Sequence, residues 1–353
     1  MGARTTDAGS AGERQPWQDV LGEDPLPWLL EESSPGVRHL ALRDLLDRPE
    51  DDGELLAARR AAGVADPLST ILNAQHPDGY WVHPGAGYDP KYTGTVWQVV
   101  FLDQLGADAA DPRVRNACEY VLTHAQTPGG GFGVRRGSSE RPPPPSTAAY
   151  CLTGNLLRAL IGFGYLDDER VRRAVDWLAG AVTGADTVRF YAGGGPLFRC
   201  GANDALPCAW GAVKAMGALA RVPVEGRSGT VQEAIAQGMR FLLSRDPAVA
   251  DYPMGYGNSR PSRSWFKLGF PSGYVTDVLQ NLEVLGELGH GADPRLHAAI
   301  DWVLSRRDAS GRWRHEYAYN GKTWVDVDPQ GAVSKWVTLR ACRVVKRSAG
   351  PPR

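Results

Sequence analysis

The feature that most constrains the fold of this chain is a segment that occurs three times, at 105–122, 163–178 and 288–304. In each copy an apolar stretch ends at a glycine, a short turn follows, and an aspartate precedes a second stretch. Glycine is typical of the residue that ends a helix, and aspartate is a preferred N-terminal cap. The pattern therefore predicts pairs of helices, the second of each pair amphipathic, joined by short turns.

The first helix of each predicted pair differs in character from the second. It is apolar or small around most of its circumference, which predicts burial on nearly every side. The segments of this kind are 93–105, 148–163, 207–220, 273–288 and 334–346, with a further one at 37–46. Together with an amphipathic helix at 66–74 and an opening helix near Trp28, they predict an all-α fold of about six inner and six outer helices. Such an alternation makes an open solenoid or a closed ring, and the apolar inner helices favour the ring.

The bulk composition limits the partners that we expect. The 353 residues carry a formal net charge of −1, which gives no electrostatic reason to expect a nucleic acid partner. No apolar run approaches the roughly 20 residues of a membrane span, so we expect no integral membrane association. The first residues lack the apolar stretch of a signal peptide, and five cysteines suit a reducing compartment, so we expect a cytoplasmic protein. We expect one domain at 21–347, with disordered ends at 1–20 and 348–353.

A second signature follows the outer helices. The loops at 75–81 and 126–132 each begin with glutamine and end with an aromatic residue after one or more glycines, and 308–313 is a looser copy. This pattern resembles the Gln-Trp repeats of the prenyltransferase and squalene-cyclase superfamily over nearly all of the chain, from about Trp28 to Lys346. The resemblance implies an (α/α)6 toroid. It also implies an apolar, isoprenoid-type ligand in the central cavity, with zinc-assisted transfer or cyclisation as the chemistry.

Long connections lead from outer to inner helices, so we expect them at one end of the ring, where the inner helices begin. Long loops in a compact domain are commonly functional, and these are rich in aromatic and basic residues. An aromatic cavity with cations at its mouth suits an isoprenoid diphosphate, although the same rings also fill an ordinary core. The residues predicted to bind ligand are Lys91, Tyr92, Trp97, Asn155, Trp210, Trp265, Lys267, Tyr274 and Trp336.

Three cysteines are predicted to meet near the starts of two neighbouring inner helices. Cys151 and Cys208 open these helices, and Cys200 lies eight residues before Cys208. Helix N-termini favour thiolates, and thiolates bind zinc, so the three residues are candidate zinc ligands. No histidine lies nearby, which departs from the zinc sites of protein prenyltransferases and lanthionine synthetase cyclases. Buried core thiols are the other interpretation.

The candidate catalytic residues are Asp204, Asp277 and Lys214. Either aspartate is placed to complete a metal site, and a buried lysine on an inner helix needs a partner. The string Asp326-Val327-Asp328-Pro329 resembles the acid motif of class II terpene cyclases but has proline in place of its last carboxylate. The alternative to an enzyme is a non-catalytic toroid that recognises a lipid or a peptide, and a protein partner is compatible with either.

Overall fold

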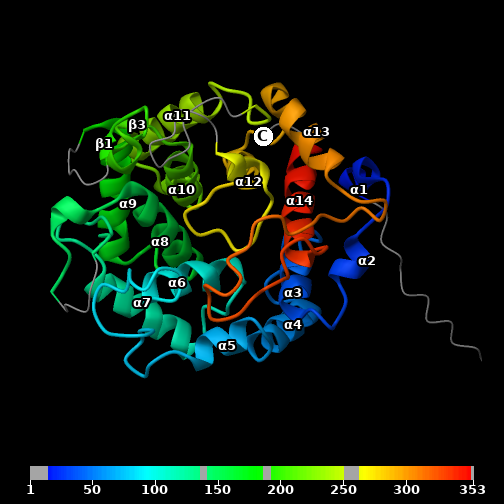
Figure 1. The fold of residues 1–353 in the computed structure, drawn as a ribbon, viewed down its shortest axis with the longest axis horizontal. Coiled ribbons are helices and arrows are strands. Elements are labelled where there is room, and N and C mark those ends of the chain that lie inside the picture. Colours follow the sequence, from blue (N-terminus) through cyan, green and yellow to red (C-terminus); the bar gives the residue numbers. More distant parts are fainter. Residues whose placement is uncertain (1–14, 136–140, 186–191, 250–261, 351–353) are drawn as a thin grey trace, which may run out of the picture.

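The computed structural model describes residues 15–135, 141–185, 192–249 and 262–350. The inner helices are α3 (Pro35–Asp44), α6 (Thr95–Gln104), α8 (Tyr150–Gly162), α10 (Ala209–Leu219), α12 (Val278–Glu287) and α14 (Lys335–Ser348). The outer elements are α1 (Pro16–Leu21), α2 (Leu26–Leu29), α4 (Gly53–Gly63), α5 (Leu68–Asn73), α7 (Pro112–His124), α9 (Glu169–Thr183), α11 (Gly229–Leu242) and α13 (His297–Ser305). Figure 1 shows the inner helices arranged around a common centre, with the outer helices outside them.

The ring is closed by contacts between the last inner helix and the first. Arg343 of α14 pairs with Asp44 of α3, and Lys346 Nζ lies 2.6 Å from Asp47 Oδ2 just beyond that helix. Lys346 also donates to the carbonyl oxygens of Asp44 and Leu45, which lie at the end of α3. The prediction of an all-α toroid is confirmed, and the open solenoid is excluded.

The recurring aspartates cap helices as the repeat predicts. Asp111, Asp168 and Asp293 each accept a hydrogen bond from the backbone N–H two residues later, at 2.8, 2.8 and 3.0 Å. A cap of this kind contributes about 1 kcal/mol to helix stability. The repeat therefore fixes where the outer helices begin.

The glutamines of the second signature join neighbouring outer helices. Gln75 Nε2 donates to the carbonyl of Arg113 at 2.9 Å, and Gln126 Nε2 donates to the carbonyl of Arg170 at 2.7 Å. Both carbonyls lie in the first turn of the next outer helix. Trp81 ends the first of these loops as a fully buried ring whose Nε1 donates to Ile71 O at 2.8 Å. The loops therefore set the spacing of the outer ring.

Two boundaries differ from the prediction. The lead-in predicted to be disordered includes α1, whose Trp17 and Leu21 are buried and which packs against α14. Residues 1–14 lie outside the described part of the chain. The inner helix predicted at 273–288 begins only at Val278, because Asp277 caps it and the preceding residues cross the middle of the ring.

A small antiparallel sheet interrupts the helical pattern between α9 and α10. Its strands are β1 (Ala192–Gly194), β2 (Arg199–Cys200) and β3 (Leu206–Pro207), paired in that order. In the part of the chain that the structure describes, no helix combines the length and the apolar character that crossing a bilayer requires.

Candidate functional site

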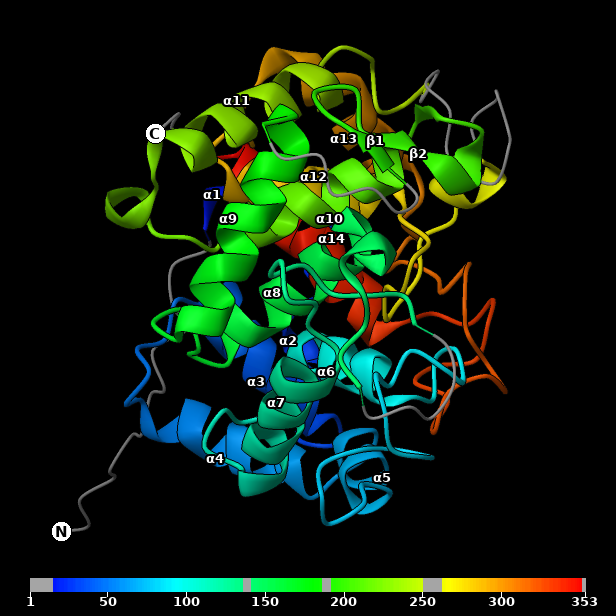
Figure 2. The same ribbon diagram turned by 90° about the vertical axis from the view of Figure 1, so that its left-hand side faces the viewer.

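Three of the long connections from outer to inner helices meet at one end of the ring, as predicted: the first (residues 80–92), the described part of the fourth (246–272) and the last (314–333). Trp324 Nε1 donates to the carbonyl of Thr93 at 3.0 Å, which joins the last long connection to the first. Gly269 and Tyr317 form an isolated backbone bridge between the fourth and the last. In the side view these segments lie together, away from the short turns between inner and outer helices (Figure 2). We call this the loop end of the ring.

Aromatic rings close the loop end. Tyr92, Trp97, Tyr274 and Tyr319 form a cluster, here called the aromatic cap. Its ring centroids lie 5.1 Å apart for Tyr92 and Trp97, 5.0 Å for Trp97 and Tyr274, and 4.4 Å for Tyr92 and Tyr319. Lys91 is exposed, with Nζ 5.2 and 5.1 Å from the centroids of Tyr92 and Tyr274. Four residues predicted to bind ligand, Lys91, Tyr92, Trp97 and Tyr274, thus lie together, and the rings pack on one another.

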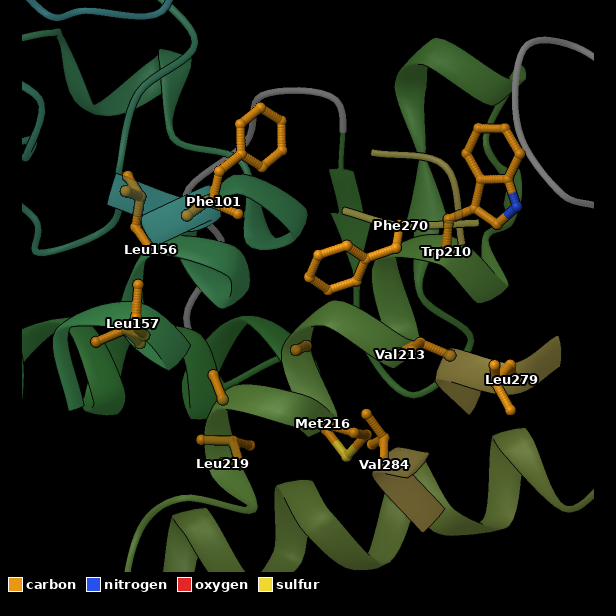
Figure 3. Close-up of a cluster of buried hydrophobic side chains, with 14 of the residues drawn as sticks. Phe101, Leu156, Leu157, Trp210, Val213, Met216, Leu219, Phe270, Leu279 and Val284 are labelled. Carbon is orange, nitrogen blue, oxygen red and sulfur yellow. The ribbon is translucent and has the colours of Figure 1, made fainter. Parts of the chain in front are cut away.

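Residues 268–277 form a plug across the middle of the ring. Gln104 of α6 both donates to Ser272 O at 2.9 Å and accepts from Ser272 N at 2.7 Å. Asn155 of α8 donates to Gly273 O at 3.3 Å, and Phe270 stacks on Trp336 of α14 with centroids 4.7 Å apart. Figure 3 shows Phe270 among the core side chains of the inner helices. The predicted residues Asn155 and Trp336 thus hold the plug.

Asp277 is the last residue of the plug, and its carboxylate holds the plug to the neighbouring helices. It accepts from Gly269 N at 3.0 Å and from Gln280 N at 2.7 Å, and Arg340 of α14 donates to both of its oxygens at 3.0 Å. Arg340 is 4% exposed and also bonds Glu283 Oε2 at 2.9 Å. Asp277 therefore joins α12, the plug and α14, and its carboxylate is occupied by these partners.

Lys214 of α10 lies behind the plug. Its Nζ donates to Gln280 Oε1 at 2.6 Å and to Ser272 Oγ at 3.4 Å. Burial lowers the pKa of Lys214 to about 7, although the nearby charge of Asp277 opposes this shift. A lysine with a pKa near neutrality exchanges its proton readily, so Lys214 has the property that a general acid or base requires.

A cavity of about 260 Å³ lies on the other side of the plug, where the inner helices end. Its lining comes from the last turns of α3 and α6, from the inward faces of α8, α12 and α14, from Arg221 just after α10, and from the plug residues Phe270 and Ser272. We call this the charged end of the ring. Among the described residues it is lined by six arginines (Arg43, Arg158, Arg221, Arg340, Arg343, Arg347) and four carboxylates (Asp44, Asp103, Glu283, Glu287).

Ion pairs organise this lining. Arg158 binds Glu287 with both guanidinium nitrogens, at 2.6 and 2.8 Å, and Arg221 Nη1 lies 2.6 Å from Asp103 Oδ1. Burial alone would raise the pKa of Glu287, but Arg158 and more distant arginines lower it to about 2. Six guanidinium groups face four carboxylates in the lining, and Asp277, which pairs with Arg340 behind it, leaves a formal excess of one positive charge. Arg343 Nε and Arg347 Nη1 are buried and donate no hydrogen bond to any described residue.

The three predicted zinc ligands are neighbours, but they do not form a metal site in the described residues. Cys200 and Cys208 share a hydrogen bond between their thiols, and Cys151 lies near enough for charge on Cys200 to affect it and for its own charge to affect Cys208. Searched over the described residues, no group of three or more His, Cys, Asp or Glu side chains is arranged to hold a metal ion. The arrangement therefore does not fit zinc, and no step below depends on a metal.

The remaining predicted residues lie apart from the cavity lining. Asp204 is exposed on the hairpin turn, and Lys267 is exposed at the loop end. Trp265 is fully buried with Nε1 bonded to Pro247 O at 2.9 Å, and Trp210 is 8% exposed in the core. Asp328, of the terpene-cyclase-like string, accepts from Ser334 Oγ at 2.7 Å. The sequence interpretation missed the arginines, although Arg158 is the only charge on α8 and three of the cavity arginines (Arg340, Arg343 and Arg347) belong to α14.

Comparisons with known proteins find similar folds at low sequence identity. No family model and no curated protein matches the sequence. A protein from Actinoplanes is 15% identical to this chain, with a TM-score of 0.46. The match spans 91% of this chain and 90% of the Actinoplanes protein. The type II terpene cyclase MstE from Scytonema is 14% identical, with a TM-score of 0.31, and the match spans 83% of this chain and 98% of MstE. A family 88 glycosyl hydrolase from Bacteroides vulgatus is 8% identical, with a TM-score of 0.49, and the match spans 90% of this chain and 91% of the hydrolase. At these values the comparisons assign no activity.

Proposed function

We propose that this toroid binds a small anionic ligand in the cavity at the charged end of the ring. The observation that carries the proposal is the excess of arginines over carboxylates around a recessed volume of about 260 Å³. A recessed site with walls of low dielectric strengthens the attraction between its charges and an anion. Guanidinium groups bind phosphates and carboxylates through paired hydrogen bonds.

Two arginines of α14 are the groups proposed to bind the anion. Arg343 and Arg347 both line the cavity. Arg343 Nε has no hydrogen-bond acceptor among the described residues, and Arg347 Nη1 lies 3.6 Å from Glu287 Oε1 without a hydrogen bond. The volume suits a phosphate, a diphosphate or a small carboxylate, since it lies below the roughly 300–1,000 Å³ of pockets for drug-sized ligands.

A prenyl diphosphate is the second candidate ligand, and it keeps the terpenoid-cyclase-like function that the glutamine-aromatic loops imply. Val100, Phe270 and Val284 give the cavity a limited apolar surface for part of a hydrocarbon chain. In this version the arginines hold the diphosphate head. Lys214, one residue layer behind Ser272 and Gln280, is then the group that holds or moves a proton. A non-catalytic toroid that only recognises the anion is the alternative to this enzyme.

Isothermal titration calorimetry with four probes tests the proposal. We expect diphosphate to bind, geraniol not to bind, and phosphate to bind more weakly than diphosphate. Geranyl diphosphate distinguishes the two ligands: tighter binding than diphosphate supports the prenyl version, and equal binding supports an anion alone. Analysis of products after incubation then separates an enzyme from a recognition module.

A matched pair of variants locates the site. Arg347→Gln removes a cavity donor, and we expect it to weaken diphosphate binding about tenfold to a hundredfold, because a hydrogen bond to a charged group contributes about 1.5–3 kcal/mol. Arg295→Gln removes an exposed arginine that pairs with Asp293 on the outer ring, and it should leave binding unchanged. Equal affinity of both variants and the unmodified protein would rule out this cavity as the site.

A further inference from the structure

The hairpin before α10 brings two cysteines to the same face of the small sheet. Cys200 ends β2 opposite Leu206, and Cys208 follows β3 and donates its backbone N–H to Phe198 O at 3.0 Å. Residues two apart on a strand point to the same face, so both thiols lie on one side of the hairpin. The carbonyl of Phe198 also accepts from Tyr150 Oη at 2.8 Å, which fixes the hairpin to the start of α8.

The two thiols lie close enough to affect each other's ionisation, and they differ in environment. Cys208 is 7% exposed and shares a hydrogen bond with Cys200, which is partly exposed. That hydrogen bond and those from the backbone N–H groups of Ala202 and Asn203 lower the pKa of Cys200 to about 7, although burial opposes the shift. The bond to Cys200, together with burial, raises the pKa of Cys208 well above its usual value. One accessible thiolate thus lies beside one buried thiol.

We propose that Cys200 and Cys208 form a redox-active dithiol that closes to a disulfide by exchange with a low-molecular-weight disulfide such as glutathione disulfide. The Cys200 thiolate attacks one sulfur of the small disulfide, which forms a mixed disulfide and releases one small thiolate. Cys208 loses its proton to that thiolate and attacks the Cys200 sulfur, which releases the second small thiolate to take a proton from water. The two protein thiols are oxidised, and one small disulfide is reduced to two small thiols.

Cys151 is the neighbour that does not take part. Burial raises the pKa of its thiol to about 12, and it projects from the first turn of α8 rather than from the hairpin. Its thiolate is scarce at neutral pH, as is that of Cys208, but Cys151 lies outside the hairpin face that carries Cys200, so it serves as a matched control for Cys208. Cys118 and Cys342 are buried on other helices, also with raised pKa values.

Thiol counting on the full-length protein tests the proposal. After incubation with glutathione disulfide and denaturation, maleimide labelling and mass spectrometry should find three free thiols instead of five. Peptide mapping should identify a link between Cys200 and Cys208. Alkylation of Cys200 by iodoacetamide should reach half of its maximal rate near pH 7, which a merely structural thiol would not do.

Three variants assign the roles. C151S should still lose two thiols, C208S should stop as a glutathione adduct on Cys200, and C200S should keep all of its remaining thiols. Five free thiols after treatment of the unmodified protein, or a disulfide that includes Cys151, would overturn the proposal. Stoichiometric zinc that protects these cysteines from oxidation would overturn it as well. The count on the unmodified protein decides the matter even where a variant fails to fold.

Discussion

The two ends of the ring differ in what fills them. At the loop end, aromatic rings contact one another and the plug, and Trp97 is fully buried. At the charged end, arginines and carboxylates from α3, α6, α8, α12 and α14, with Arg221 after α10, surround a cavity. At the charged end the cavity lies among the inner helices. At the loop end the space, about 360 Å³, lies between the starts of α3 and α14 and residues 325–328, beside the aromatic cap and not within it. The difference shows that the rings predicted to line a ligand cavity pack on one another instead.

We expect the largest loss of stability from removing Arg340, which lines the cavity at the charged end. Arg340→Ala leaves the buried carboxylates of Asp277 and Glu283 without their shared partner. We expect the free energy of unfolding to fall by about 3–5 kcal/mol, as when one member of a buried ion pair is removed. Urea denaturation measures it. Tyr319→Phe at the loop end removes one hydrogen bond to Gly273 N and should cost about 1 kcal/mol. Similar losses in both variants would contradict the contrast between the ends.

A substitution at Gly273, with an intermediate expected loss of stability, tests how tightly the loop end is packed. A Cβ at Gly273 would lie 2.9 Å from Tyr319 Oη and 3.0 Å from a ring carbon of Tyr92. Gly273→Ala should therefore destabilise the protein by about 1–3 kcal/mol, the range for overpacking, as measured by urea denaturation. Gly226→Ala is the matched control, since a Cβ there meets nothing within 4 Å. A stability equal to that of the control would mean that the aromatic cap holds spare room.

The smallest effect concerns Lys214, between the two ends. Its folded pKa of about 7 is below the usual value of 10.5, so between these pH values the unfolded chain binds a proton that the folded chain does not. Stability should therefore rise with pH in this window, by about 1.4 kcal/mol from pH 7 to pH 8 at most, and the full penalty remains below pH 7.

The comparison with Lys214→Met isolates this contribution. Measured by urea denaturation at pH 6, 7, 8 and 9, the unmodified protein should gain stability relative to the variant above pH 7. Burial is the main cause of the lowered pKa of Lys214, and the charged or titratable groups that act on its ammonium are Asp277, Arg340, Arg158 and Cys151. A difference independent of pH would mean that Lys214 keeps its proton throughout.

The sequence predicted the helix pairs well because their signals are local. Asp111, Asp168 and Asp293 cap the helices that follow them, and a cap needs only the next few residues. The meeting of Cys151 with Cys200 and Cys208 was also predicted, since adjacent inner helices of a toroid bring their starts together.

The charged cavity is harder to predict because its charged residues come from six separate parts of the chain, and only α3, α12 and α14 supply more than one each. Arg158 gives no local sign that Glu287 faces it, since the two residues are 129 positions apart and meet only when the ring closes. For the aromatic residues the location could be predicted, but their role could not. Trp97 and Tyr274 were correctly predicted to meet, but a sequence does not distinguish a ring that lines a cavity from one that fills it.

The most direct test of the account is a crystal structure determined with diphosphate. We predict density for the anion in the cavity at the charged end, within hydrogen-bond distance of Arg343 and Arg347. Density among Tyr92, Trp97 and Tyr274 at the loop end, with the charged cavity holding only water, would contradict it.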